Sequence, residues 1–244
     1  MMKTIRTRIP ALAMAAAMTL SLSACSGGGL TTDDASKCVQ VELDATYKGS
    51  FAGFVDFYSN VTTEDAKKQY DANVEGESRN FINMYGLPSY EDTNTVLEAS
   101  EMQMNRAKEL YKDIYAKADY SITSTNKQDD GTFAVKVNIK PMDIIKLVDD
   151  NFEEGFAEFD AKFSAIADQV NTMEEDEFLT WYTETYAREY YDTLLDVLEE
   201  QVPNSGYLDE KSIVIQVQQS EEGALFISDE DFGNLDWLII DYNM

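Results

Sequence analysis

The spacing of apolar residues changes between a helical and a strand pattern along the chain. Runs with an apolar residue every three or four positions predict helices, and runs with one at every second position predict strands. The predicted helices span residues 33–47, 51–58, 62–85, 94–118, 145–170, 174–201 and 229–240. Two β-hairpins are predicted over residues 120–139, with a turn at Asp130 and Gly131, and over residues 213–228, with Gly223 in the turn.

The longest apolar stripe begins at Ile145 and ends at Val170. Its members follow one another at intervals of three or four positions: Ile145, Val148, Phe152, Phe156, Phe159, Phe163, Ile166 and Val170. We therefore predict one continuous helix of about 40 Å. A break near Asn171 and Thr172 separates it from the next helix, which Pro203 follows.

The order of elements is helices, hairpin, helices, hairpin. Because an isolated hairpin is only marginally stable in water, we expect the two hairpins to form one antiparallel sheet that helices cover on one face. This arrangement belongs to the α+β class. Residues 35–141 and 142–244 each hold one helical block and one hairpin, and they form either two units or one integrated domain.

The N-terminal residues have the pattern of an export signal. Lys3, Arg6 and Arg8 precede the uncharged apolar residues 11–22, which are too few to span a bilayer stably. Residues 22–25, Leu-Ser-Ala-Cys, resemble a bacterial lipobox.

The lipobox resemblance implies that residues 1–24 are a cleaved signal peptide and that Cys25 carries the lipid. Multiple acyl chains would then hold the protein on the outer face of the cell membrane. Residues 25–34, which include three consecutive glycines, are predicted to be a flexible tether. The alternative is a secreted protein in which Cys25 is incidental.

The charge balance excludes several classes of function. The chain has 46 acidic and 19 basic residues, no histidine, and a net charge of −27; removing three basic residues with the signal peptide gives −30. So acidic a chain is not expected to bind nucleic acid or anionic lipid by charge. Without histidine, the Ser-His-Asp and Cys-His catalytic arrangements are impossible, and so are zinc sites that require histidine.

Candidate reactive groups are few. With Cys25 lipidated, Cys38 has no disulfide partner, and its helical spacing indicates a buried apolar role. Ser124 and Lys127 match an S-x-x-K pattern, but they close a predicted strand instead of opening a helix. Acidic runs, such as the one with Asp229, Asp231 and Asp236, are interpreted as solvated helix ends, and we expect neither a metal ion nor a cofactor.

Aromatic residues are concentrated on the helix predicted after residue 174. They exceed what one buried stripe can hold, and Tyr and Trp combine an apolar body with a polar tip. The alternative is a thick aromatic core. The candidate binding surface consists of Trp181, Tyr182, Tyr186, Tyr190 and Tyr191.

Several short runs resemble a lipoprotein family of unknown function in Gram-positive bacteria. These are residues 43–49 (LDATYKG) with the Phe51 to Phe54 turn, residues 120–137, and residues 141–143 (PMD). The resemblance implies an α+β lipoprotein related to the cystatin-like or NTF2-like folds with a concave sheet. It supplies no catalytic residue.

We therefore predict a lipid-anchored extracytoplasmic lipoprotein that binds a small ligand or a protein of the cell envelope, and not an enzyme. The concave face of the sheet and the aromatic helix are the expected contact surfaces. The alternatives are an envelope hydrolase that uses two carboxylates, and a structural spacer.

Overall fold

The computed structural model describes residues 30–87, 98–221 and 223–242. The predicted signal peptide, Cys25 and half of the predicted tether (residues 25–29) lie outside these residues. Helix α1 (Thr32–Lys48) begins inside the predicted tether, so residues 32–34 are helical. Thr31 caps this helix in a reciprocal capping box with Asp34, so the helix begins one residue before the predicted start at residue 33.

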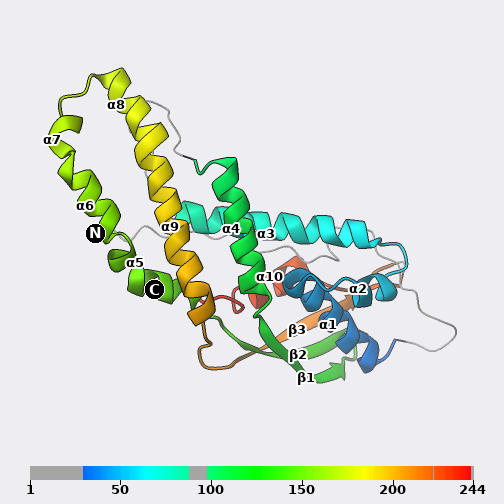
Figure 1. The fold of residues 1–244 in the computed structure, drawn as a ribbon. Helices are drawn as coiled ribbons and strands as arrows, with labels where there is room; N and C mark the ends of the chain where they lie inside the picture. Colours follow the sequence, from blue (N-terminus) through cyan, green and yellow to red (C-terminus); the bar gives the residue numbers. More distant parts are fainter. Residues whose placement is uncertain (1–29, 88–97, 222, 243–244) are drawn as a thin grey trace.

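Four helices form the first helical block (Figure 1). Besides α1, two of them begin with capping boxes: Thr62 with Asp65, and Ser100 with Gln103. Gly49 ends α1 in the left-handed conformation, with φ of 59°, which a side chain would disfavour. After α1 come α2 (Ala52–Phe57), α3 (Thr63–Tyr85) and α4 (Glu101–Tyr115).

Both predicted hairpins are present, and they join into one antiparallel sheet. The strands lie in the order β1-β2-β3-β4, and they are β1 (Asp119–Lys127), β2 (Phe133–Lys140), β3 (Lys211–Gln219) and β4 (Leu225–Ile227). Strands β2 and β3 pair Val135 with Ile215, which puts the apolar positions of both hairpins on one face. The α+β class is therefore confirmed, and the finer resemblance to cystatin-like folds stays a prediction.

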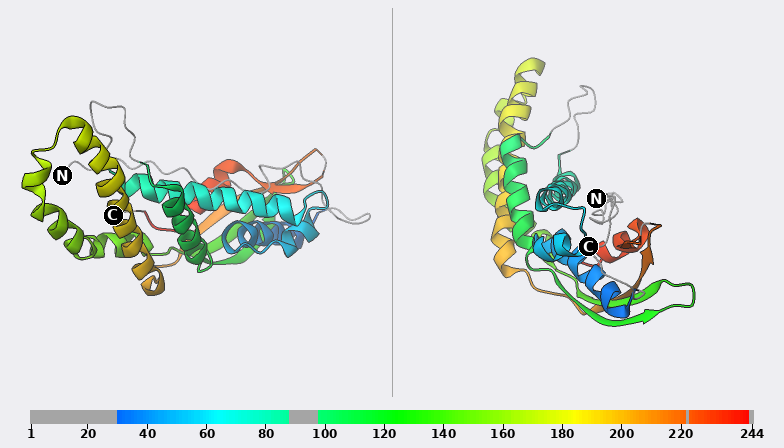
Figure 2. Two further views of the ribbon diagram at one scale, coloured as in Figure 1. Left: turned by 45° about the horizontal axis from the view of Figure 1, so that its top comes forward. Right: turned by 90° about the vertical axis from the view of Figure 1, so that its right-hand side faces the viewer.

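Helices fill the apolar face of the sheet. Helix α1 contacts all four strands, and α10 (Asp229–Asp236) packs beside it through the stacked rings of Tyr47 and Phe232 (Figure 2). The side chains under these helices are fully or almost fully buried: Phe133, Val135, Val137, Ile139, Ile215 and Val217. The expected binding surface on a concave sheet face is therefore occupied by core packing. On β1, Ser124 and Lys127 are exposed, as expected for a chance S-x-x-K match.

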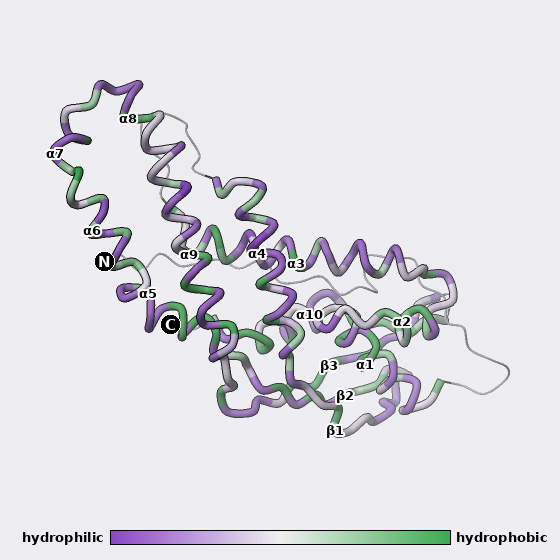
Figure 3. The backbone as a smooth tube through the Cα atoms, viewed as in Figure 1, coloured by the Kyte–Doolittle hydropathy of each residue, from purple (hydrophilic) through white to green (hydrophobic). Residues whose placement is uncertain are grey.

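The second helical block forms two long legs, of which the returning one is helical without interruption from Glu175 to Gln201. The outgoing leg contains α5 (Ile144–Gly155), α6 (Ala157–Ala165) and α7 (Ala167–Val170). The returning leg contains α8 (Glu175–Trp181), the π-helical turn η1 (Tyr182–Tyr186) and α9 (Ala187–Gln201), and the 3₁₀ turn η2 (Val202–Asn204) follows. Figure 3 shows hydrophobic and hydrophilic segments alternating along both legs, as amphipathic helices require.

The prediction of one continuous helix over residues 145–170 is wrong. The helix breaks at Phe156 and again at Ile166, where ψ is close to zero. Gly155 lowers the helix propensity before the first break, and the β-branched Ile166 stands at the second. The phenylalanines on both sides of the first break still face the returning leg: the rings of Phe156 and Phe159 lie 5.0 Å from Tyr190 and 5.1 Å from Tyr186.

Candidate functional site

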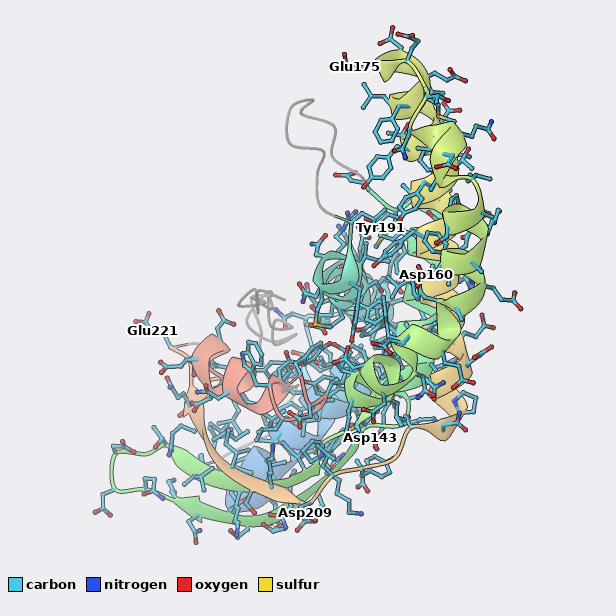
Figure 4. The ribbon with its side chains drawn as sticks, turned by 90° about the vertical axis from the view of Figure 1, so that its left-hand side faces the viewer. Asp143, Asp160, Glu175, Tyr191, Asp209 and Glu221 are labelled. Atoms are coloured by element: carbon cyan, nitrogen blue, oxygen red, sulfur yellow. The ribbon has the colours of Figure 1, made fainter. Side chains whose placement is uncertain are left out.

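We call residues 144–201 the arm. In each view of Figures 1 and 2 it projects from the rest of the protein, with the turn between α7 and α8 at its far end. The returning leg holds 27 residues from Glu175 to Gln201, which corresponds to a length of roughly 40 Å. Figure 4 shows Glu175 at the tip of the arm and Asp143 at its base.

Aromatic rings from the two legs interlock along the arm. Near the base, Phe156 lies 5.0 Å from Tyr190 between ring centroids. Further out, Phe163 lies 4.8 Å from Tyr186 and 5.8 Å from Trp181, in edge-to-face geometry that aromatic pairs favour. The candidate aromatic residues therefore meet the phenylalanine stripe of the outgoing leg, a pairing that each stripe alone could not reveal.

Helix α4 holds the base of the returning leg. The amide of Gln103 donates to the Arg188 carbonyl at 2.7 Å and to Asp192 at 2.8 Å. Arg106 forms ion pairs with Asp196 and Glu199. These contacts fix α9, whereas α8 and η1 lie beyond them.

The far end of the arm is packed less completely than its base. Phe156, Phe159 and Phe163 are 3%, 5% and 9% exposed, so burial decreases toward the tip. Beyond them, α7, α8 and η1 contain no buried residue. The tip is therefore a two-helix layer whose apolar side chains are only partly covered.

Four of the five predicted surface residues lie at this boundary. Trp181, Tyr182, Tyr186 and Tyr190 are half-buried. Partial burial raises the pKa of both Tyr182 and Tyr186 above the ordinary tyrosine value. The Tyr190 hydroxyl donates to the Tyr85 carbonyl at 2.5 Å, so Tyr190 anchors the arm to α3.

Tyr191 does not belong to the surface. It is 2% exposed, and it packs in the core with its ring 5.6 Å from that of Tyr190. Its assignment to the candidate surface is wrong because a helix turns the next residue by about 100° toward another face. Conversely, Phe163 and Phe178 were missed as neighbours of Trp181, which lies 5.8 and 5.9 Å from their rings.

Tyrosine hydroxyls hold the buried carboxyl groups of the body. Glu42, Glu77 and Asp236 are at most 1% exposed. A tyrosine donates to each: Tyr58 to Glu42 at 3.1 Å, Tyr242 to Glu77 at 2.7 Å and Tyr47 to Asp236 at 2.8 Å. In the described part of the chain, these contacts join carboxyl groups to tyrosines instead of to one another, which favours a structural role over paired acid–base chemistry.

Cys38 lies in this buried polar network. It is fully buried, and its Sγ lies 3.3 Å from the Tyr58 hydroxyl. Burial, followed by the nearby Glu42, raises the pKa of the thiol far above its usual range. A raised pKa favours the protonated thiol. The prediction that Cys38 is buried is confirmed.

The acidic residues of α10 have separate roles. Asp231 accepts from the Ser228 hydroxyl at 3.1 Å at the start of the helix, while Asp236 faces Tyr47 in the core. In residues 30–87, 98–221 and 223–242, no group of three or more Asp, Glu or Cys side chains could hold a metal ion. None of the helices in these residues is long and apolar enough to cross a bilayer.

The sequence matches no protein-family model and no curated protein. Among solved structures, a protein of Bacillus subtilis described as "putative lipoprotein (ycdA)" has a similar fold, with a TM-score of 0.50 and 16% sequence identity. The similarity covers 85% of this chain and 56% of that protein, so this chain spans little more than half of its length. At this identity the comparison concerns the fold: the chain is similar in architecture to a bacterial protein described as a lipoprotein.

Proposed function

We propose that this protein is a lipoprotein, anchored outside the cell membrane through Cys25, whose arm binds a partner in the cell envelope. The N-terminal sequence pattern supports the lipid anchor. The fold similarity to a protein described as a lipoprotein agrees with it. The observation that carries the binding role is the arm itself, whose far end projects from the body with no buried residue in α7, α8 or η1.

The start of the described chain supports an orientation for this arm. The Leu30 carbonyl lies 3.5 Å from Lys127 Nζ, and Ser36 lies 2.7 Å from Thr125 between hydroxyl oxygens. The chain therefore enters the body beside the end of β1. In Figure 1 this region is at the lower right and the tip of the arm at the upper left. With Cys25 in the membrane, the arm would point away from the bilayer.

Labelling with radioactive palmitate tests the anchor. We expect the wild-type protein to be labelled and to sediment with membranes, and we expect Cys25→Ser to lose both properties. The control is Cys38→Ser, which leaves the lipid acceptor in place and should remain labelled. An unlabelled wild-type protein would refute lipidation.

Site-specific photocrosslinking in native cells tests the arm. A photoreactive amino acid at Leu179 should crosslink to a discrete envelope protein, while the same group at Glu64, exposed on α3, should not. Trp181→Ala should abolish the Leu179 crosslink because it removes the indole ring that packs against Phe163, Phe178 and Tyr186. If crosslinking is equal from both positions, or survives Trp181→Ala, the binding role of the arm is refuted.

A further inference from the structure

The tip of the arm combines partly exposed apolar side chains with a surface of one charge. Its apolar residues are all half-buried, and we call six of them the distal seam: Ile166, Val170, Met173, Phe178, Leu179 and Trp181. A contiguous, partly exposed apolar surface is typical of an interaction site. Its aromatic members are of the type that supplies most of the binding energy at protein interfaces.

Exposed carboxylates alternate along the chain with the residues of the distal seam. Residues 166–184 contain six acidic residues and no basic residue. All six are exposed: Asp168, Glu174, Glu175, Asp176, Glu177 and Glu184. Further down the arm, Lys162 is already engaged by Glu189. Among the described residues, no cation neutralises the tip by an ion pair.

We propose that the tip of the arm binds an amphipathic segment of a partner protein that is rich in lysine or arginine. This inference rests on the proposed function and names the chemistry of the partner. Apolar side chains of the segment pack on the distal seam, and its cations pair with the exposed carboxylates. Trp181 also offers an aromatic face to a lysine or arginine side chain. An apolar centre with a charged rim is the usual anatomy of such an interface.

Charge excludes the other occupants of the seam. A second copy of the chain would bring its own six carboxylates against these six, and such like-charge contacts cost several kcal/mol. Anionic lipid and nucleic acid are repelled for the same reason. A divalent cation alone has no place, because the described residues contain no cluster that could hold one.

Peptide binding tests this inference with the mature lipidated protein in phosphatidylcholine nanodiscs. The probes are fluorescent peptides of about 18 residues, long enough for five helical turns. One is an amphipathic leucine–lysine helix, one replaces each lysine with glutamate, and one keeps the lysines but scrambles the amphipathic order. We expect the first to bind, more weakly as salt increases, and the other two to bind at least about tenfold more weakly.

Charge-neutralising variants locate the binding. Glu175→Gln, Asp176→Asn and Glu177→Gln together should weaken binding of the leucine–lysine peptide by about tenfold or more. Because these residues also favour the first turn of α8, a second variant, Asp168→Asn with Glu184→Gln, changes charge outside that turn and should weaken binding about threefold or more. The matched control neutralises three exposed residues of the body, Glu64, Asp129 and Glu221, and should change binding less than twofold.

Two results would overturn the inference: equal binding of the lysine and glutamate peptides, or arm variants that bind as tightly as the body control. Its failure is distinguishable from failure of the proposed function. If the Leu179 crosslink in cells depends on Trp181 but the basic peptide does not bind, the arm is a docking site for a partner of another chemistry. If that crosslink is also missing, the docking role itself fails.

Discussion

At the scale of single residues, tyrosine performs the task that cationic side chains perform in many other proteins. A buried carboxyl group needs a hydrogen-bond donor, and a charged donor would itself have to lose its hydration. A tyrosine hydroxyl supplies the donor while its ring adds apolar surface to the core. Pairs such as Tyr120 with Asp44, at 2.7 Å, and Tyr85 with Asp149, at 2.6 Å, repeat this solution at the edge of the core.

Tyr58→Phe tests how much one such hydroxyl contributes. The hydroxyl is within hydrogen-bond distance of Glu42, of the Leu225 carbonyl and of Cys38, so its removal leaves buried polar atoms without this partner. We expect the free energy of unfolding in urea to fall by about 1–3 kcal/mol. Tyr70→Phe is the control, since no hydrogen bond of its hydroxyl is present among the described residues; it should change stability by less than about 0.5 kcal/mol. Equal effects of both substitutions would contradict this assignment.

Alkaline pH should destabilise the protein through the same tyrosines. Burial raises the pKa of Tyr70 to about 12, and burial with Asp44 raises the pKa of Tyr120 further. The folded pKa therefore exceeds the unfolded value of about 10, and the stability that these groups contribute is lost as pH rises from about 10 through 12.

Two measurements made together check this dependence. Tyrosinate absorbance should report delayed ionisation in the folded protein, and urea titrations should show a lower free energy of unfolding at about pH 11.5 than at about pH 9. A tyrosine absorbance curve that coincides in folded and urea-unfolded protein would show that the rings are not protected.

At the scale of elements, local patterns predicted the identity of most helices and strands, while tertiary contacts decided their ends and breaks. Alternation and the Asp130–Gly131 turn predicted the first hairpin, and the apolar spacing predicted α3 over residues 62–85, close to its observed bounds. The break at Phe156 and the π-helical turn η1 were not predicted, because apolar spacing is the same in a continuous helix and in one that bends. Both irregularities adapt the legs to ring packing between them.

Gly155 is the position where the two legs approach most closely. A Cβ atom at this position would overlap Cγ2 of Val197 and lie 3.5 Å from its Cβ. Because valine is stiff in a helix, Gly155→Ala should push α5 from α9 and lower the free energy of unfolding by about 1 kcal/mol, despite the better helix propensity of alanine.

Gly76→Ala is the matched control for Gly155→Ala. No atom lies within 4 Å of a Cβ at Gly76, so this substitution should stabilise α3 by about 0.5–1 kcal/mol. Adding Val197→Ala to Gly155→Ala should remove the overlap, so the stability loss from Gly155→Ala should be smaller in that background. If Gly155→Ala stabilises the protein as Gly76→Ala does, the close approach of the legs is not a constraint.

At the scale of the whole molecule, the sequence predicted the class and the aromatic helix but not the arm. In the sequence, the apolar stripe of each leg looks like that of a helix packed on the core. The contact between the Phe163 and Trp181 rings shows instead that the two stripes pack on each other and not on the sheet. Tyr191 is buried because it lies on a different face of α9 from Tyr190. The acidic run after residue 173, which alone indicates a solvated helix end, begins α8 at the tip of a projecting arm, where Figure 4 shows Glu175.

The orientation of the arm gives the last prediction. Leu30 is five positions after Cys25, so the chain between them can reach no more than roughly 17 Å at about 3.4 Å per residue. If Cys25 is lipidated, the β1–β2 turn must lie near the bilayer and the tip of the arm far from it.

With acceptor dyes in the lipid headgroups, a fluorescent amino acid at Asp129 should transfer energy more efficiently than one at Glu175. Inserting about 20 Gly and Ser residues after Gly28 should reduce transfer from Asp129 toward the level of Glu175, because a flexible linker lets the body leave the surface. Equal transfer from the two positions without the insertion would mean that the arm lies along the membrane and is not presented to a partner beyond it.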